Sequence, residues 1–384
     1  MDNLRPNYHH DFGIDSFDNI FKRDFSQVKV SDFDYFLPEE KIAQFPSQKR
    51  DHSRLMVLNR KTQAIEHKLF YQITEYFKPG DLLVLNNTKV IPASIIGKKE
   101  SGSAVIDVLL IKQIGASVWE CLVKPGKRLK EGARIIFGDG KLTGKVIKKT
   151  ESGGQIIEFD GDLFDFVKTH GKIPLPPYIK KMSNDPSAVL GTSKCQMTNE
   201  KGKASLFERY QTVYAKKEGA SAAPTAGLHF TPELLGKIKQ KGVNIAYVTL
   251  HTGLATFKPV YAENVHEHKM YEEKYEIPPE TVKAIKEAKR IIAVGTTTVR
   301  TLETLALQLL NAASGFSGET DLFIYPGFKF KIVDAMITNF HFPRSTLLML
   351  VSAFAGKEFI QNAYKEALNS GYRFFSFGDA MLII

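Results

Sequence analysis

Cysteine is scarce in this sequence of 384 residues, and no apolar run is long enough to cross a membrane. The two cysteines, Cys121 and Cys195, lie far apart and lack the spacing of a structural zinc site. Their scarcity argues against a disulfide framework and fits a reducing compartment. The longest apolar run, residues 346–356, is well short of the roughly 20 residues of a spanning helix. Residues 1–28 lack the apolar segment of a signal peptide, so we predict a cytoplasmic protein with a flexible N-terminal extension.

Nucleotide-binding fingerprints are missing as well. Neither a P-loop nor a GxGxxG dinucleotide motif occurs in the chain, so a nicotinamide cofactor is not expected. His266 and His268 stand one residue apart, but no third ligand follows at a suitable spacing, and we expect no metal. What is present is an ordinary globular composition with a formal net charge of +10. Such a charge suits a polyanionic partner.

The hydrophobic pattern divides the chain into two kinds of structure. Between residues 81 and 160, short β-rich runs such as DLLVLN, AVIDVLLI and QIIEF are separated by glycine-containing turns, which predicts a small, inserted β-barrel domain. Residues 29–80 and 161–384 alternate helical and strand-like patterns and predict an α/β catalytic domain. A polar stretch at 182–205 predicts a surface insertion. The expected fold class is therefore a mixed-sheet α/β domain carrying a small barrel.

Three loops rich in threonine and glycine lie next to predicted strands and helices. Their sequences are GASAAPTAGLHFT (219–231), VTLHTGLATFKP (248–259) and VGTTTVR (294–300). Ligands of open α/β sheets bind at such loops, where bare backbone and hydroxyls face outward. Gly227 is expected to let a ligand approach the backbone, although the threonines could equally form caps and turns. The predicted substrate contacts in these loops are Thr225, Gly227, Thr249, Gly253, Thr296, Thr297 and Thr298.

Four residues are candidates for moving protons. His229, at the end of AAPTAGLHF, is either a general base or a half-buried histidine bonded to the backbone. His251 directly follows its predicted strand, which favours a functional role. Glu273 is a candidate acid or base in a polar segment. Asp379 has apolar neighbours, where a buried carboxylate needs a partner, so it could equally be structural.

Four further residues are candidates for binding. Asn339 and His341 follow an apolar strand and form either a turn or a binding edge. Arg300 and Arg344 carry guanidinium groups, which suit a carboxylate or a phosphate.

Basic residues gather in the predicted barrel, where residues 122–149 hold nine basic and two acidic side chains. Together with the segment PLPPYIKK, they could follow a phosphate backbone or form a solvated lysine surface. A chemical site in one domain and a basic surface in another are typical of an enzyme that modifies nucleic acid. The candidates for nucleic-acid contact are Lys124, Lys127, Arg128, Lys180 and Lys181.

Several long segments resemble one known family. They include FDYFLPEEKIAQFP, RDHSRLMVLNR, GDLLVLNNTKVIPA, GASAAPTAGLHFTPELL and DAMITNFHFPRSTLLMLVSAFAG, ordered and spaced as in the S-adenosylmethionine:tRNA ribosyltransferase-isomerases of queuosine biosynthesis. The resemblance covers residue 29 to the end and implies an α/β domain with an inserted barrel. It also implies that the ribosyl part of S-adenosylmethionine is transferred to 7-aminomethyl-7-deazaguanine at the wobble position of tRNA and isomerised. The products are epoxyqueuosine-tRNA, adenine and methionine.

The resemblance also implies roles for the candidates. We expect His229 or His251 to supply one of the two roles of base and acid, and Glu273 or Asp379 to supply the other. The loops are expected to hold ribose and methionine, and the arginines to bind the methionine carboxylate or a tRNA phosphate. S-adenosylmethionine is then a substrate rather than a cofactor, tRNA is the partner, no membrane is involved, and a monomer is expected. Tyr271 stands where the family carries the second histidine of its HxMHxE motif, so that role does not transfer. A non-catalytic RNA-binding protein and a small-molecule transferase or hydrolase remain alternatives.

Overall fold

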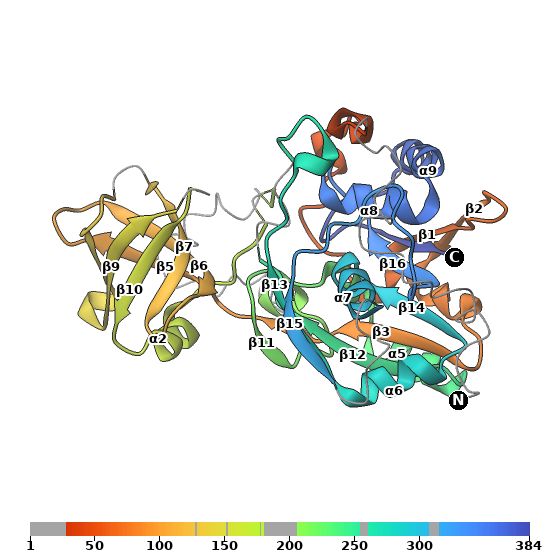
Figure 1. Cartoon of the computed structure of the whole chain (residues 1–384), viewed down its shortest axis with the longest axis horizontal. Coiled ribbons are helices and arrows are strands. Elements are labelled where there is room, and N and C mark those ends of the chain that lie inside the picture. The colour runs from red at the N-terminus through yellow and green to blue at the C-terminus, as the bar shows by residue number, and fades with distance from the viewer. Residues whose placement is uncertain are drawn as a thin grey trace, which may run out of the picture.

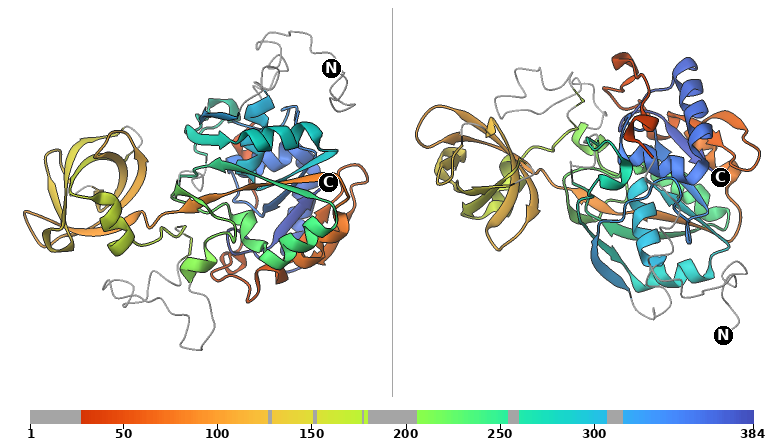
Figure 2. Two further views of the ribbon diagram at one scale, coloured as in Figure 1. Left: turned by 90° about the horizontal axis from the view of Figure 1, so that it is seen from below. Right: turned by 45° about the horizontal axis from the view of Figure 1, so that its top comes forward.

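The chain forms an α/β body built on one large sheet, together with a separate closed β-barrel (Figure 1). The computed structural model describes residues 28–126, 129–150, 153–176, 178–179, 206–253, 260–306 and 315–384. Figure 2 shows the barrel beside the α/β body from two further directions. In these ranges, no helix is long and apolar enough to cross a membrane. The predicted fold class, a mixed-sheet α/β domain with an inserted barrel, is confirmed.

Nine strands form the large sheet. The strands β12, β3, β14 and β16 run parallel to one another, whereas β13, β15 and β2 pair antiparallel near the edges. Every residue of β3, β16 and β17 is buried, as expected for strands covered on both faces. Across the sheet the order is β15 (Phe316–Thr320), β13 (Glu273–Ile277), β12 (Asn244–Leu250), β3 (Asp81–Asn86), β14 (Arg290–Val294), β16 (Ala335–Asn339), β17 (Ala380–Ile383), β1 (Arg54–Leu58) and β2 (Ile65–Leu69).

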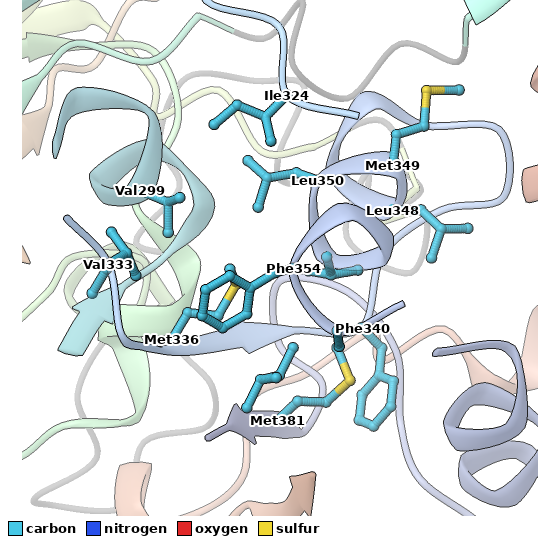
Figure 3. Packing of buried hydrophobic residues seen from close by; sticks show 14 of the residues in the cluster. Val299, Ile324, Val333, Met336, Phe340, Leu348, Met349, Leu350, Phe354 and Met381 are labelled. Carbon is cyan, nitrogen blue, oxygen red and sulfur yellow. The ribbon is translucent and has the colours of Figure 1, made fainter. Parts of the chain in front are cut away.

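Helices cover both faces of the sheet, and alternate residues of each strand point to opposite layers. In β3, Leu82 and Val84 belong to one core, and Leu83 and Leu85 belong to the other. Figure 3 shows the first core, where side chains of α7 and α8 lie over Met336 of β16. Its helices are α6 (Pro279–Glu287), α7 (Thr296–Ala306), α8 (Thr346–Ala355) and α9 (Lys357–Asn369). The second core contains α5 (Pro232–Gln240) and the 3-10 helix η5 (Phe70–Tyr76).

The barrel closes through six strands in the order β10-β7-β6-β5-β8-β9. Gly97 allows this closure, because a Cβ there would lie 2.6 Å from the Phe137 ring that fills the interior. The helix α2 (Leu163–His170) packs Phe166 into the same core. The strands are β5 (Ser94–Lys99), β6 (Val105–Gln113), β7 (Val118–Lys124), β8 (Arg134–Phe137), β9 (Leu142–Lys149) and β10 (Gln155–Asp160).

The start of the barrel differs from the prediction. We predicted a barrel over residues 81–160, but β3 (Asp81–Asn86) pairs in parallel with β12 and β14 at the centre of the large sheet. The closed barrel begins at β5. Its sequence, SIIGKK, gives only a weak strand signal because it contains a glycine and two lysines. Between the two, β4 (Thr88–Val90) pairs with β11 (Lys217–Ala220). Because α2 packs into the barrel core, its residues belong with the barrel rather than with the α/β body.

Candidate active site

A cleft opens where the parallel strands of the large sheet end. It is lined by residues 295–297 after β14, by residues 339–342 after β16, and by the start of the 3-10 helix η8 (Thr225–His229). Thr252, beyond β12, and Phe375 with Ser376, before β17, complete the lining. The carboxyl ends of parallel strands are the usual binding position in such sheets. Among the described residues that line this cleft, none is a lysine, arginine, aspartate or glutamate.

Aromatic rings form one wall of the cleft. Phe342 stacks on Phe375 with ring centroids 3.5 Å apart, and Tyr178 packs against both at 5.0 Å. Phe375 has a φ of 70°, in the left-handed region that a bulky side chain rarely adopts. Strained backbone of this kind is maintained at functional sites by the surrounding structure. The wall therefore offers a fixed aromatic surface to a flat or cationic ligand.

Hydroxyl groups and a helix N-terminus form the opposite wall. Gly295, with a φ of 90°, turns the chain from β14 into α7, so that Thr296 and Thr297 reach the cleft in the first helical turn. The first amides of a helix have no partner within the helix and favour a negative charge. The Thr252 hydroxyl lines the same cleft, is buried, and has no hydrogen-bond partner among the residues that the structure describes.

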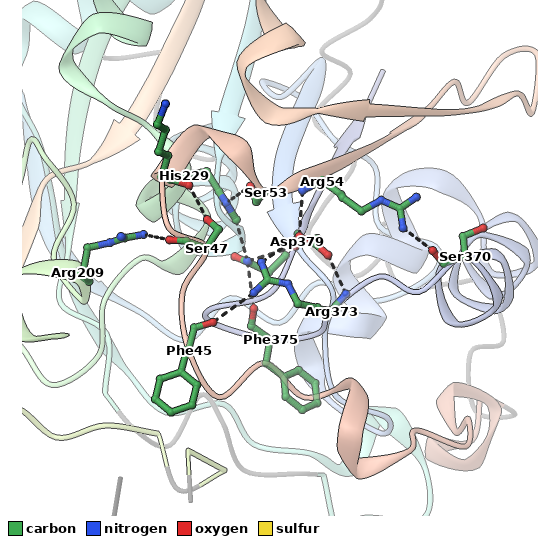
Figure 4. Close-up of polar contacts among 12 residues, drawn as sticks. Phe45, Ser47, Ser53, Arg54, Arg209, His229, Ser370, Arg373, Phe375 and Asp379 are labelled. Atoms are coloured by element: carbon green, nitrogen blue, oxygen red, sulfur yellow. Dashed lines mark hydrogen bonds and ion pairs between the residues drawn. The ribbon is translucent and has the colours of Figure 1, made fainter. Parts of the chain in front are cut away.

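His229 lies just behind the cleft, held through both ring nitrogens (Figure 4). The Asn339 amide nitrogen lies 3.1 Å from Nε2 of His229 and also donates to the backbone oxygen of Phe375 at 3.2 Å. Thr225 donates to the amide oxygen of Asn339, which orients the amide. Because Asn339 is the donor, Nε2 carries the lone pair, and Nδ1–H donates to the Ser53 hydroxyl at 2.7 Å.

The surroundings of His229 keep its ring neutral. Burial, together with the positive charges of Arg373 and Arg50, lowers the pKa of His229 to about 3. Its ring stacks on Phe70 with centroids 4.9 Å apart. His341, which lines the cleft and bonds the Thr338 hydroxyl at 2.9 Å, also has its pKa lowered to about 3 by burial. Both rings are uncharged near neutral pH.

Comparison with known proteins identifies the family. The sequence pattern of the queuosine biosynthesis proteins matches residues 30–383. The chain belongs to this family. Relatives named S-adenosylmethionine:tRNA ribosyltransferase-isomerase include those of Thermotoga maritima, 53% identical over 361 residues, and Halothermothrix orenii, 53% identical over 363 residues. Each match covers 93% of this chain and 100% of the relative.

A crystal structure described as S-adenosylmethionine tRNA ribosyltransferase from Thermotoga maritima is also similar. It is 44% identical to this chain, with a TM-score of 0.51, and the match covers 92% of this chain and 100% of the other. The resemblance noted in the sequence is therefore confirmed, and this queuosine biosynthesis protein shares its fold with a solved relative.

Among the predicted proton carriers, only His229 lies beside the cleft. Asp379, 2% exposed, accepts hydrogen bonds from the amides of Arg54 and Arg373 and from the Arg373 guanidinium (Figure 4). Surrounded by donors, this carboxylate holds the last strand in place. It does not line the cleft, which corrects its expected role as an acid or base.

Glu273 and Arg300 correct the prediction together. They form a buried ion pair with each other, and Arg300 also donates to the backbone oxygen of Leu322 at 2.9 Å. Neither lines the cleft. Arg344 is half-exposed and pairs with Asp34 at 2.8 Å, outside the cleft. A guanidinium bound to a carboxylate of its own chain is already neutralised, so we no longer assign anion binding to either arginine.

His251 lies away from His229. Its Nδ1 bonds the Thr88 hydroxyl at 2.8 Å, and its ring packs on Gly219, where a Cβ would lie 2.8 Å from the ring. Burial is the main cause of its lowered pKa. It does not line the cleft.

The threonine and glycine loops are only partly brought together. Thr225, Thr296 and Thr297 line the cleft with Asn339 and His341. Thr249 instead donates to Asn87 at 2.7 Å, and Thr298 to the backbone oxygen of Val294 at 2.7 Å, so both have structural partners. Gly253 is half-buried beside the cleft residue Thr252 but is not in its lining.

Gly227 has a different role from the predicted one. A Cβ at this position would lie 2.0 Å from the Tyr214 hydroxyl and 2.8 Å from Thr212 Cγ2. The close approach that requires glycine is therefore made by this chain's own side chains rather than by a ligand.

Of the predicted nucleic-acid contacts, only Lys124 lies in the described part of the chain. It is exposed at the end of β7. Lys127, Arg128, Lys180 and Lys181 lie outside the described residues. Tyr271, at the position of the missing family histidine, is half-exposed. Within the described ranges, no group of three or more His, Cys, Asp or Glu residues is placed to hold a metal ion.

The sequence did not point to several residues of the site. Ser53, Arg50 and Arg373 surround His229 but lie far from it along the chain, and Tyr178 and Phe375 reach the cleft from separate segments. The available signals were segments that carry the family resemblance: RDHSR contains Arg50 and Ser53, PLPPYIKK contains Tyr178, and YRFFSFGDAMLI contains Arg373 and Phe375.

Proposed function

We propose that this chain is an S-adenosylmethionine:tRNA ribosyltransferase-isomerase. In this proposal it moves the ribosyl part of S-adenosylmethionine onto 7-aminomethyl-7-deazaguanine at the wobble position of tRNA, forms epoxyqueuosine, and releases adenine and methionine. Full-length relatives of that name, 52–53% identical, support the reaction. The structural observation that carries it is an uncharged cleft with an aromatic wall, unpartnered donors, and a neutral histidine behind it.

The two walls suit the two ends of S-adenosylmethionine. Tyr178, Phe342 and Phe375 supply stacking for adenine and a π surface for the sulfonium cation. The first turn of α7 and the Thr252 hydroxyl supply donors for the methionine carboxylate. In this assignment a helix N-terminus, rather than the predicted Arg300 and Arg344, binds the methionine carboxylate. It also gives the unpartnered Thr252 hydroxyl an acceptor.

His229 is the proposed base. The sulfonium acidifies the protons of the neighbouring sugar carbon, and Nε2 of His229 takes one of them while the electron pair stays on that carbon. Asn339 occupies Nε2 before substrate binds, so its amide must turn away for the transfer to occur. The bond between Nδ1 and Ser53 keeps the ring in the tautomer that has its lone pair on Nε2. The amine of 7-aminomethyl-7-deazaguanine forms the new bond to the sugar with its lone pair and loses a proton. Adenine leaves with the electron pair of its bond to the sugar and takes up a proton, and methionine leaves with the electron pair of its carbon–sulfur bond, which turns the sulfonium into a neutral thioether.

The barrel is the proposed second contact for tRNA, through its exposed basic side chains. We further propose that the enzyme works as a cytoplasmic monomer without a cofactor, with S-adenosylmethionine consumed as a substrate.

The test supplies both substrates to the purified protein. S-adenosylmethionine is incubated with tRNA that carries 7-aminomethyl-7-deazaguanine, and the digested nucleosides are analysed by mass spectrometry. Epoxyqueuosine with an equal amount of adenine is the expected result. Salt-sensitive tRNA binding without product would instead favour an RNA-binding protein, and adenine release without tRNA would favour a small-molecule enzyme.

A further inference from the structure

A second, smaller pocket lies on the other side of His229. It is lined by Ser47, Arg50, Arg209, Leu228, His229 and Ser376. Ser376 also lines the main cleft, and Asn339 of the cleft bonds Nε2 of His229. The two pockets therefore adjoin through His229, Asn339 and Ser376.

Two guanidinium groups line this second pocket without a carboxylate partner. Arg50 donates to the backbone oxygens of Leu228 at 3.1 Å and Glu208 at 2.7 Å. Arg209 donates to the backbone oxygens of Gln48 at 2.8 Å and Ser47 at 2.6 Å; Figure 4 shows the bond to Ser47. Nε of Arg209 is buried and has no hydrogen-bond partner in the part of the chain that the structure describes. Within the described part of the chain, neither arginine forms an ion pair, in contrast to Arg300, Arg344 and Arg373.

Unpaired cations brought together in this way are costly without an anion. Burial and the charge of Arg209 lower the pKa of Arg50 to about 10. The planar fork of arginine suits the oxygens of a phosphate, and such an anion would compensate both charges.

We propose that Arg50 and Arg209 bind a backbone phosphate of the RNA substrate, next to the nucleotide whose base enters the main cleft. The inference rests on the proposed function, because it takes the cleft to hold that base. Two arginines whose remaining N–H groups are available can donate to several phosphate oxygens at once. Both side chains are only half-buried, so the pocket is accessible to an RNA strand. A phosphate contact of this kind sets the position of the RNA without reading its sequence.

A phosphate in this pocket also acts on His229. Arg50 is one of the two positive charges that lower the pKa of His229. Neutralising Arg50 removes part of that effect and raises the basicity of Nε2. Binding of the RNA substrate would therefore make Nε2 of His229 more basic than it is in the free enzyme.

The experiment compares Arg209→Gln and Arg50→Gln with Arg60→Gln as a matched control. Arg60 also bonds two backbone oxygens, those of Phe354 and Asp334, and also has a buried, unpartnered Nε, but it lines neither pocket. Substrate tRNA binding is measured over a range of salt concentrations. Each pocket variant is expected to reduce the salt slope by up to about 0.7, the share of one neutralised phosphate in a single strand, and the double variant by no more than that, because both arginines bind the same phosphate. The KM for tRNA should rise roughly tenfold or more while the KM for S-adenosylmethionine stays unchanged.

Modified RNA tests the same contact with the wild-type protein, so the test does not depend on the folding of a variant. Wild-type protein is titrated with anticodon stem-loops that carry a single uncharged methylphosphonate linkage, placed in turn around the wobble nucleotide. An uncharged linkage at one position is expected to weaken binding to the wild-type protein as much as the Arg209→Gln substitution does. The same linkage should not weaken binding to the Arg209→Gln variant any further.

The outcomes separate this inference from the proposed function. Wild-type product formation with unchanged salt slopes in both pocket variants would overturn the phosphate site and leave the reaction standing. A raised KM for S-adenosylmethionine alone would show that the pocket holds the methionine carboxylate, and would overturn it too. Failure of the wild type to form product would instead reject the proposed function.

Discussion

His229 shows how one buried residue can remain a base at any physiological pH. Because its pKa is lowered to about 3, the ring is already deprotonated at neutral pH. We expect kcat/KM to show no histidine limb near pH 6.5 and to stay level down to about pH 5. His229→Gln should lower kcat by about 10²–10⁴-fold, the usual contribution of a general base. His266→Gln, at an exposed position, serves as the control.

Steady-state rates of adenine release between pH 5 and 8.5 check this prediction. A wild-type limb near pH 6.5 that disappears in His229→Gln would show that the ring is not held neutral. Wild-type turnover in His229→Gln would remove the residue from the mechanism.

The same burial makes stability depend on pH. His229 and His341 are neutral in the folded chain, with pKa values lowered to about 3, whereas in the unfolded chain they take up a proton near pH 6.5. The unfolded state therefore binds more protons between these values, and stability is complete above pH 6.5 and falls as the pH drops below it. The expected loss is on the order of 1 kcal/mol per pH unit for each histidine.

Urea unfolding at pH 7.5, 6.0 and 5.0 measures this dependence. In His341→Gln, the decrease from pH 6.0 to 5.0 should be smaller than in the wild type by about one histidine's share, even though the variant is less stable throughout. Equal decreases in the two proteins would contradict a neutral, buried His341.

At the scale of elements, the N-terminus of α7 is the proposed carboxylate site, and Thr252 tests it. Its hydroxyl has no hydrogen-bond partner among the described residues, so Thr252→Val removes an unsatisfied polar group and should leave the free energy of unfolding unchanged or raised. If the hydroxyl donates to the methionine carboxylate, the KM for S-adenosylmethionine should rise roughly tenfold. Thr249→Val, which breaks the bond to Asn87, is the control and should lower stability without this effect on KM. An unchanged KM in Thr252→Val would contradict the assignment.

The 3-10 helix η8 depends on glycine at position 227 for a packing reason. Gly227→Ala places a Cβ 2.0 Å from the Tyr214 hydroxyl and is expected to cost about 1–3 kcal/mol through overpacking. The Tyr214 hydroxyl is itself buried and has no hydrogen-bond partner within the described ranges, so Tyr214→Phe alone should cost little. The double variant should recover part of the loss, and the rest remains because Thr212 Cγ2 is also close. Thermal unfolding of the four proteins gives the coupling, and fully additive losses would contradict the contact.

The elements that were predictable from sequence are those with strong local signals. Thr231 and Pro232 begin α5 as expected, with the Thr231 hydroxyl accepting the amide of Leu234, and the runs of apolar residues become the central strands. The start of the barrel was missed because β3 reads equally well as a barrel strand or as a buried parallel strand. Only its pairing with β12 and β14 decides between the two, and that pairing is non-local.

The candidate site was predicted at the level of loops rather than of individual side chains. Residue type singled out His229, which lies next to the cleft, but the same logic also selected Glu273, Arg300 and Asp379, which do not line it. Glu273 and Arg300 are occupied by each other, and Asp379 is occupied by the nearby Arg373 and by the amide of Arg54, which is distant in sequence. Whether a charged residue is free for a ligand depends on such partners, and spacing along one chain carries no record of them.

At the scale of the whole molecule, tRNA is proposed to contact both the α/β body and the barrel. Lys145, Lys148 and Lys149 of β9 are exposed on the outside of the barrel, and Lys145 lies opposite Arg134 of β8. Replacing these three lysines with glutamine should lower the salt slope of tRNA binding by about 0.7–0.9 for each phosphate that the barrel no longer neutralises. At saturating tRNA, kcat should be unchanged, because the barrel does not line the cleft.

A matched variant separates direct phosphate binding from a general effect of charge. Replacing Lys237, Lys239 and Lys283, which are exposed on α5 and α6, removes the same net charge from the α/β body. If the barrel binds the RNA, only the β9 variant should have a reduced salt slope of tRNA binding. When the β9 substitutions are combined with Arg209→Gln, the two reductions should add, because independent phosphate sites release counterions independently. Equal effects of the two triple variants would mean that net charge alone attracts the tRNA. A combined reduction no larger than that of Arg209→Gln would mean that the barrel binds the RNA only after the phosphate is seated beside His229.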